Sequence, residues 1–311
     1  MTGGLRAGFD LGGTQLKFGL IDEEGRIVFK DRIPTPGSIE GLIGMIAEIW
    51  RTMGTRYPGR ISSAGFGFAG FYNQSERKIL HSPNYPSLNN VDLVPLLGRV
   101  LDVPFEIDND ANMAAYGEWK YGAGRGVHSL VFLTIGTGIG SGIILDGRLW
   151  HGKCGYAGEL GHITINPEGT RCSCGNFGCL ETEASAPKII KNYISLTGKD
   201  DGLTAEDIDA LARKGDRAAL ESFAKCGTYL GIGLGIVINF LNPEKIILGG
   251  GVMTAGEFLL NPALEEARRR SHRVSYACTS IVKASLSNDA GLIGAAAWAR
   301  DQAGSRPPAR S

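Results

Sequence analysis

Short apolar segments that end in glycine dominate the start of the chain, and their spacing predicts strands. Residues 5–11 and 16–21 form two such segments around a glycine turn, and "DEEG" then precedes a third, "RIVF". Runs of this length bounded by glycine and acidic residues are typical of β-hairpins. We therefore expect the chain to begin with an antiparallel ribbon.

The same layout returns in residues 128–150, "HSLVFLTIGTGIGSGIILDGRLW". Shifting the first segment by 124 positions brings three pairs into register: Gly12 with Gly136, Leu20 with Ile144, and Asp22 with Asp146. A repeat of strand, glycine turn and strand predicts two similar α/β halves, each with a ribbon followed by helix-linked strands. Two such halves imply a cleft between them.

Helical spacing of apolar residues and buried apolar runs predict the other elements. Helices are expected over residues 38–53, 89–101, 111–122, from 184 onward, 204–214, 216–238, 255–270 and 290–302. Strands are expected over residues 61–70, 103–110 and 244–252. We predict a small α/β domain over residues 1–115, rejoined by the helix at 288–302, a large α/β domain over 116–287, and a loose tail at 303–311.

The composition is that of a globular protein with an excess of glycine. Glycine supplies 46 of 311 residues, about twice its usual share of ~7%, which favours close approach of the backbone to a ligand or to other backbone. Thirty-two basic residues balance thirty-two acidic ones, so the charge does not favour nucleic acid or a membrane surface as partner. The start shows no signal peptide and "YLGIGLGIVINFL" is short for a membrane span, so we expect a soluble, cytoplasmic protein.

Two glycine turns occupy equivalent places in the repeated frame, "DLGGTQLK" at residues 10–17 and "TIGTGIGSG" at 134–142. Backbone N–H groups in such turns can bind phosphate oxygens, Thr14 can add a hydroxyl, and Asp10 can hold Mg²⁺. Taken singly, each turn also fits a plain β-hairpin, and neither has the spacing of a P-loop. A third glycine run, "GGG" at 249–251, either lets an adenine or ribose lie against the backbone or is only a tight turn.

The segment "IDNDAN" at residues 107–112 places carboxylates and amides where a predicted strand meets a predicted helix. A carboxylate there could take the proton of an attacking hydroxyl, as a general base in phosphoryl transfer to an alcohol. The alternative is that Asp110 only caps the helix.

Three of the six cysteines lie close together in "TRCSCGNFGCLE", residues 170–181. With an upstream histidine they form a set of the Cys₃His type that zinc takes in structural sites: His162, Cys172, Cys174 and Cys179. Reduced free thiols and a redox pair are the alternatives, the latter weakened by the absence of CxxC. A disulfide is the less favoured interpretation because cytosolic thiols are kept reduced.

Two carboxylates flank these cysteines, Glu159 before His162 and Glu181 after Cys179. A loop folded around a metal would hold both rigidly in the cleft. Carboxylates fixed in this way can each accept hydrogen bonds from neighbouring hydroxyls of a polyol. Together with the phosphate turns, they favour a sugar kinase.

From "FDLGGT" to "GAAAWA", and most specifically in "GELGH" followed by "CSCGNFGCLE", the sequence resembles the ROK family of bacterial sugar kinases and sugar-responsive repressors. The resemblance implies a two-domain actin-like ATPase (ribonuclease H-like) fold with a cleft between a smaller and a larger domain. It also implies ATP-dependent phosphorylation of the 6-hydroxyl of a hexose, most like a glucokinase, with Mg²⁺, structural Zn²⁺ and a homodimer.

The resemblance also implies roles for individual residues. Asp110 is the expected catalytic base, although Asp108 stands two positions earlier, where many members have glutamate. The implied sugar ligands are Gly70, Asn84, Asn109, Asp110, Glu159, His162 and Glu181, with the histidine using one ring nitrogen for zinc and the other for a hydroxyl. The implied ATP ligands are Asp10, Gly12, Gly13, Thr14, Lys17, Gly136, Thr137, Gly138, Gly249, Gly250 and Gly251, with Asp10 near Mg²⁺.

Several functions remain open on the sequence alone. Kinases for N-acetylglucosamine, N-acetylmannosamine, mannose or fructose have the same architecture, and polyphosphate or ADP replaces ATP in related proteins. The repressors of the family carry a helix-turn-helix segment ahead of this fold, for which a first strand starting near residue 5 leaves no room. An actin-like scaffold or chaperone ATPase would need neither the sugar ligands nor the zinc loop.

Overall fold

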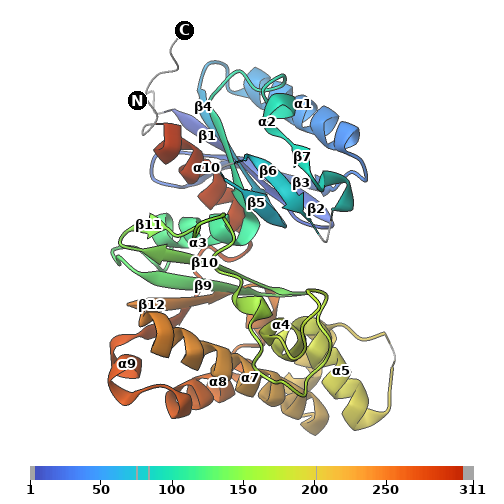
Figure 1. The fold of residues 1–311 in the computed structure, drawn as a ribbon. Helices are drawn as coiled ribbons and strands as arrows, with labels where there is room; N and C mark the ends of the chain where they lie inside the picture. Colours follow the sequence, from blue (N-terminus) through green and yellow to red (C-terminus); the bar gives the residue numbers. More distant parts are fainter. Residues whose placement is uncertain (1–3, 75, 83–84, 201, 304–311) are drawn as a thin grey trace.

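Two five-stranded sheets form the framework of the protein (Figure 1), seen in a computed structural model that describes residues 4–74, 76–82, 85–200 and 202–303. The first sheet has the order β3 (Ile27–Pro34), β2 (Gln15–Ile21), β1 (Leu5–Leu11), β4 (Ile61–Phe68), β8 (Phe105–Asn109). The second has the order β11 (Arg148–Leu149), β10 (Ile139–Leu145), β9 (Leu130–Ile135), β12 (Lys245–Gly249), β13 (Ser280–Lys283).

The two sheets match strand by strand, which confirms the predicted duplication. In each, an antiparallel ribbon comes first and parallel strands are added on its other side. The strands β1 and β9, which head the two ribbons, are buried along most of their length, as expected for apolar runs covered on both faces.

The remaining strands β5 (Phe71–Asn73), β6 (Lys78–His81) and β7 (Val91–Asp92) form a small separate sheet. The helices are α1 (Ile39–Arg56), α2 (Val94–Leu97), α3 (Asp110–Tyr121), α4 (Leu180–Ala184), α5 (Ala186–Thr197), α6 (Ala205–Arg213), α7 (Arg217–Leu241), α8 (Glu257–Arg270), α9 (Arg273–Cys278) and α10 (Ala290–Ala303). Single 3₁₀ turns occur at η1 (Pro86–Leu88), η2 (Leu160–His162), η3 (Gly251–Ala255) and η4 (Ser287–Asp289).

The predicted helix over residues 89–101 is wrong in its extent. Val91 and Asp92 pair with β6 instead, and only Val94–Leu97 is α-helical. The reason is local, because the Asp92 carboxylate accepts a hydrogen bond from the Val94 amide at 3.0 Å and starts the helix there. The first part of the predicted helix thus forms strand β7, which pairs with β6.

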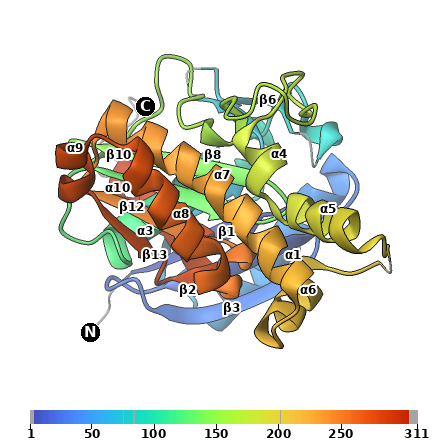
Figure 2. The same cartoon turned by 90° about the horizontal axis from the view of Figure 1, so that it is seen from below.

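Helix α7 forms the centre of the core behind the second sheet. Its buried face includes Phe223, Leu230, Leu234 and Ile238. It packs along α8 (Figure 2). By length and composition this helix could cross a membrane, but half of its apolar window is buried in the fold. Its hydrophobicity is therefore accounted for by packing.

Helices α3 and α10 lie between the two sheets (Figure 1). Helix α3 leads from β8 to β9, and α10 packs on α3, β1 and β4. The close packing of α10 on β4 and on α3 depends on glycine. A side chain at Gly65 would clash with the Ala295 carbonyl, and one at Gly294 would clash with the Met113 carbonyl. The predicted boundary between residues 115 and 116 falls inside α3, and the domain limits stay a prediction.

Candidate active site

A polar cavity of about 300 Å³ lies where the end of β8 meets the β9–β10 turn and the loop containing η2. Most of the predicted sugar ligands and one of the predicted phosphate turns line it, although they come from distant parts of the chain: Gly70, Asn109, Asp110, Gly136, Thr137, Gly138, Glu159, His162 and Glu181. Asn84 lies outside the described residues. The fold therefore brings the motif residues together in one place.

Asp110 begins helix α3 and is partly buried in the cavity wall. Its Oδ1 accepts a hydrogen bond from the Ala111 amide at 2.9 Å. Burial, reinforced by the negative charges of Asp10 and Glu159, raises the pKa of Asp110 to about 6, against the opposing effect of the backbone hydrogen bonds. A carboxylate of this kind is ionised at neutral pH and is a stronger base than an exposed aspartate.

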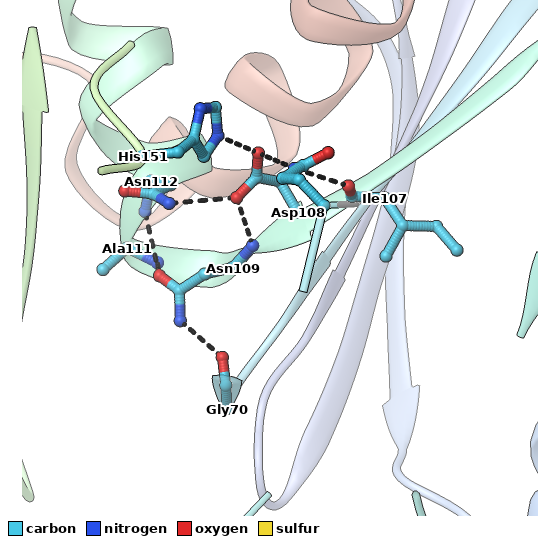
Figure 3. A network of polar contacts seen from close by, with 8 residues as sticks. Gly70, Ile107, Asp108, Asn109, Ala111, Asn112 and His151 are labelled. Atoms are coloured by element: carbon cyan, nitrogen blue, oxygen red, sulfur yellow. Dashed lines mark hydrogen bonds and ion pairs between the residues drawn. The ribbon is translucent and has the colours of Figure 1, made fainter. Parts of the chain in front are cut away.

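Asn109 is the residue that caps helix α3, a role that the sequence left open for Asp110. Its Oδ1 accepts hydrogen bonds from the amides of Ala111 at 2.9 Å and Asn112 at 3.1 Å. Its Nδ2 donates to the Gly70 carbonyl at 3.0 Å (Figure 3). One amide hydrogen of Asn109 thus remains for a ligand, and Asp110 is spared from capping.

Asp108 is buried, with 2% of its side chain exposed. Both of its oxygens are occupied by donors. Figure 3 shows His151 Nε2 at 2.6 Å, the Asn109 amide at 2.7 Å and Asn112 Nδ2 at 3.0 Å, and Gln74 Nε2 donates at 2.6 Å. Asp108 does not line the cavity. Of the two competing carboxylates, Asp110 is the one placed to meet a substrate.

The two acids predicted to bind the sugar, Glu159 and Glu181, line the cavity on the side of the second sheet. Glu159 is partly exposed at the cavity mouth, and the desolvation it undergoes there raises its pKa, with a counteracting effect from His162 and a smaller raising effect from Glu181. Glu181 Oε2 accepts a hydrogen bond from the Ile139 amide at 2.9 Å. This bond ties the predicted sugar ligand to the end of the 136–138 phosphate turn, so the two parts of the site are linked.

The four predicted zinc ligands form a compact group, with their ligand atoms all within 4.8 Å of one another. Cys174 Sγ and Cys179 Sγ are 3.7 Å apart, and Cys172 Sγ is 3.5 Å from His162 Nδ1. Zinc bond lengths of about 2.3 Å to sulfur and 2.0–2.1 Å to nitrogen give tetrahedron edges of about 3.8 and 3.6 Å. The cysteines are free thiols, and their spacing fits a metal site rather than a disulfide.

His162 is oriented between this group and the cavity. Its Nδ1 faces Cys172, while its Nε2 lies 3.9 Å from Glu159 Oε2. The two ring nitrogens therefore face different partners, and their roles toward zinc and a sugar hydroxyl stay a prediction. A metal on Nδ1 would fix the ring and leave Nε2 free to bind a ligand.

A second cavity of about 200 Å³ adjoins the first and shares Asp110, Ala111 and Thr134 with it. It contains the predicted ATP ligands Asp10, Gly12, Lys17 and Gly250, whereas Gly13, Thr14, Gly249 and Gly251 line neither cavity. Lys17 Nζ lies 3.2 Å from Asp10 Oδ2. Burial raises the pKa of Asp10, and Lys17 opposes that rise.

The second cavity is also lined by residues that the sequence analysis did not single out, namely Ser287 and Asn288 in the turn η4 and Gly291 in the first turn of α10. Gly291 lies close to Asp10, since a Cβ there would come within 3.0 Å of the carboxylate carbon. Asn288 accepts a hydrogen bond from Lys17 Nζ through its carbonyl, at 3.3 Å. The only available signal was the polar "SND" before the last helix.

Comparison with known proteins gives this arrangement a context. The chain matches the ROK family over residues 6–302. It is 33% identical to a glucokinase of Streptomyces coelicolor, over 96% of this chain and 98% of that protein. The crystal structure of a ROK family glucokinase from Streptomyces griseus in complex with glucose and AMPPNP superposes with a TM-score of 0.83 at 32% identity, covering 96% of this chain and all of that one (100%).

A xylose repressor of Bacillus subtilis is also similar, at 31% identity over 94% of this chain and 76% of the repressor. Fold, site and relatives together define a hexose kinase, a phosphotransferase with an alcohol acceptor, built on the two-domain actin-like ATPase fold. The chain belongs to the ROK family.

Proposed function

We propose that the protein transfers the γ-phosphoryl group of ATP to the 6-hydroxyl of glucose. The observation that carries this proposal is the position of Asp110 in the wall shared by two adjoining cavities. One cavity holds the carboxylates and imidazole suited to a polyol, and the other holds Asp10, Lys17 and a glycine turn suited to phosphates.

On the sugar side, Glu159 and Glu181 would accept hydrogen bonds from neighbouring hydroxyls, and His162 would use Nε2. Asn109 would donate its remaining amide hydrogen, and the backbone at Gly70 lies beside it. Glu181 and Asn109 are held by hydrogen bonds to the backbone, which would favour one orientation of the sugar. Asn84 is assigned to the same set by the family resemblance.

The chemical step assigns one role to Asp110. Its carboxylate takes the proton of the 6-hydroxyl while the hydroxyl oxygen forms a bond to the γ-phosphorus. The bond from that phosphorus to the bridging oxygen breaks, and ADP leaves with the electron pair. The raised pKa of about 6 makes Asp110 a better proton acceptor than an exposed aspartate and keeps it ionised at neutral pH.

ATP would lie along the second cavity and extend into the first, with its phosphates against the turns at residues 10–17 and 136–138 and its adenosine against residues 249–251. The phosphate contacts proposed are Gly12, Gly13, Thr14, Lys17, Gly136, Thr137 and Gly138. Asp10 would hold Mg²⁺, which would neutralise charge on the phosphates. Lys17 Nζ lies 3.2 Å from Asp10 Oδ2. When Mg²⁺ balances the charge of Asp10, Lys17 would turn to a phosphate oxygen.

Zinc is proposed as a structural ion on His162, Cys172, Cys174 and Cys179. It would hold the loop between Glu159 and Glu181 in shape, and it leaves no ligand position for water. A cytoplasmic location fits the reduced state of these thiols. A homodimer is proposed from the family resemblance.

The test is a measurement of ADP release with Mg-ATP across glucose, mannose, fructose, N-acetylglucosamine and N-acetylmannosamine, with Asp110→Ala alongside. Glucose turnover that is lost in the variant supports both the substrate and the base. Preference for another sugar changes the substrate and keeps the mechanism. No turnover with any sugar, together with a sugar-dependent shift of DNA in a gel, would favour a regulator like the xylose repressor.

A further inference from the structure

Asp108 lies at a junction of three segments, although it faces neither cavity. It is the last but one residue of strand β8, and Gln74 reaches it from the segment after β5. His151 reaches it from the loop after β11 (Figure 3). Strands β8 and β11 belong to different sheets. The hydrogen bond between His151 and Asp108 therefore joins the two halves of the molecule beside the active site.

The partners of Asp108 are not equivalent. Asn109 is the last residue of β8, Asn112 lies in α3 directly after it, and Gln74 follows β5, so all three belong to the side of the first sheet. Of these four donors to Asp108, only His151 comes from the side of the second sheet. The distance between His151 and Asp108 must therefore change if the two sheets move relative to each other.

The hydrogen bond between His151 and Asp108 is shielded from solvent and supported by a neighbouring ring. The His151 side chain is 18% exposed and its ring lies 5.7 Å from the ring of Trp298 on α10. Burial alone would lower the pKa of His151, but the hydrogen bond and charge of Asp108 outweigh it and the net pKa is raised. His151 Nε2 lies 2.6 Å from a carboxylate oxygen of Asp108, and hydrogen bonds to an ionised carboxylate are among the stronger ones in proteins.

Both ends of this bond lead directly to substrate ligands. Asp108 accepts the amide of Asn109, which caps α3 and precedes Asp110. The loop of His151 runs on to Glu159, and on the way Tyr156 packs edge-to-face on Phe71 at 5.6 Å. Phe71 itself lines the sugar-side cavity.

We propose that His151 is a positioning residue for phosphoryl transfer: through Asp108 it holds the Asn109–Asp110 segment in register with the loop that carries Glu159. This role rests on the proposed hexose kinase function. It makes a prediction that a merely stabilising contact does not. Loosening the bond should separate the base from the sugar ligands, while the nucleotide contacts at Asp10, Gly12 and Lys17, which lie on β1, on β2 and in the turn between them, stay as they are.

The informative variant is His151→Phe, which keeps a ring against Trp298 and removes the N–H. We expect kcat/KM for the hexose to fall by at least about tenfold, since small displacements of a reacting group are costly. The KM for ATP should change by less than about twofold. His151→Gln, whose amide can still donate to Asp108, should recover most of the loss.

His128→Phe is the matched control, because His128 is exposed and lines neither cavity. It should leave both substrates' constants unchanged. Melting temperatures of all variants separate loss of folded protein from loss of positioning.

Three results would overturn the proposal while the kinase function stands. The first is an unchanged kcat/KM for hexose in His151→Phe, and the second is a KM for ATP that rises as much as the KM for hexose. The third is a kcat/KM for hexose that does not recover in His151→Gln. A wild-type protein that phosphorylates no hexose overturns the proposed function and this role together. The two failures are therefore distinguishable.

Discussion

Replacing Asp110 with Asn should abolish most activity and, at neutral pH, make the protein more stable. The substitution preserves the shape of the side chain and the oxygen that accepts the Ala111 amide. It removes the negative charge that burial and Asp10 disfavour. Activity and stability are thus expected to change in opposite directions at one residue.

The size of the stability change follows from the pKa. The native pKa of Asp110 is about 6, against 3.8 for the free side chain, and one pKa unit corresponds to about 1.4 kcal/mol. Keeping Asp110 ionised thus costs the native state up to about 3 kcal/mol. Since the side chain is partly exposed and sits at a helix N-terminus, which favours a negative charge, we expect a gain of about 1–2 kcal/mol in Asp110→Asn.

The sign of the pH dependence is fixed by the same values. Above pH 6 both native and unfolded chains carry the charge, and the native state bears its full cost. As the pH falls below 6 the native state takes up a proton first, and below about 4 the cost vanishes. The advantage of Asp110→Asn should therefore be largest at pH 7.5 and less than half as large at pH 4.5.

The assay is urea unfolding followed by tryptophan fluorescence at both pH values, without nucleotide or Mg²⁺, together with kcat at pH 7.5. Loss of a general base lowers kcat by about 10²–10⁴-fold. Asp31→Asn, an exposed acid on β3, is the control and should show no such gain. Lower stability of Asp110→Asn at pH 7.5, or the same gain at both pH values, would refute the reasoning.

Three further predictions concern the base, the metal loop and the packing of α10. The kcat/KM for hexose should fall about tenfold per pH unit below pH 6, as Asp110 takes up a proton, and remain level from pH 7 to 8; rates across pH 5 to 8 check this. Cys174→Ser should lower the zinc content and raise the KM for hexose, because the loop before Glu181 loosens; metal analysis and kinetics decide it. Gly65→Ala should destabilise the protein by about 1–3 kcal/mol because the new Cβ clashes with the Ala295 carbonyl, and thermal unfolding measures this change.

The sequence predicted the framework well because its signal is local. Residues 5–11 form β1 as predicted, and the matching of β1–β2 with β9–β10 follows the glycine turns read from the repeat. It did not predict the β5–β7 sheet, whose strands have two to four residues. Segments that short carry no usable periodicity, and their pairing is decided by the surrounding fold.

The candidate site divides in the same way. Asp110, Glu159, His162 and Glu181 stand in motifs, and the structure gathers them around one cavity. Asn288 and Gly291 reach the second cavity only because α10 returns to the first sheet from the far end of the chain. A single polar residue before a helix does not indicate such a long-range contact, and neither does an isolated histidine like His151.

The two aspartates of "IDNDAN" show what decides which carboxylate is the base. Asp108 and Asp110 are separated by one residue and have the same side chain, so sequence alone distinguishes them only through the family motif. In the fold, Asp108 accepts hydrogen bonds from four donors, which occupy both of its oxygens, and it lines neither cavity. Asp110 has a backbone amide as partner, is desolvated, and faces like charge, so its affinity for a proton rises where substrate can supply one. The environment therefore makes one aspartate an anchor between two halves of the molecule and the other a proton acceptor.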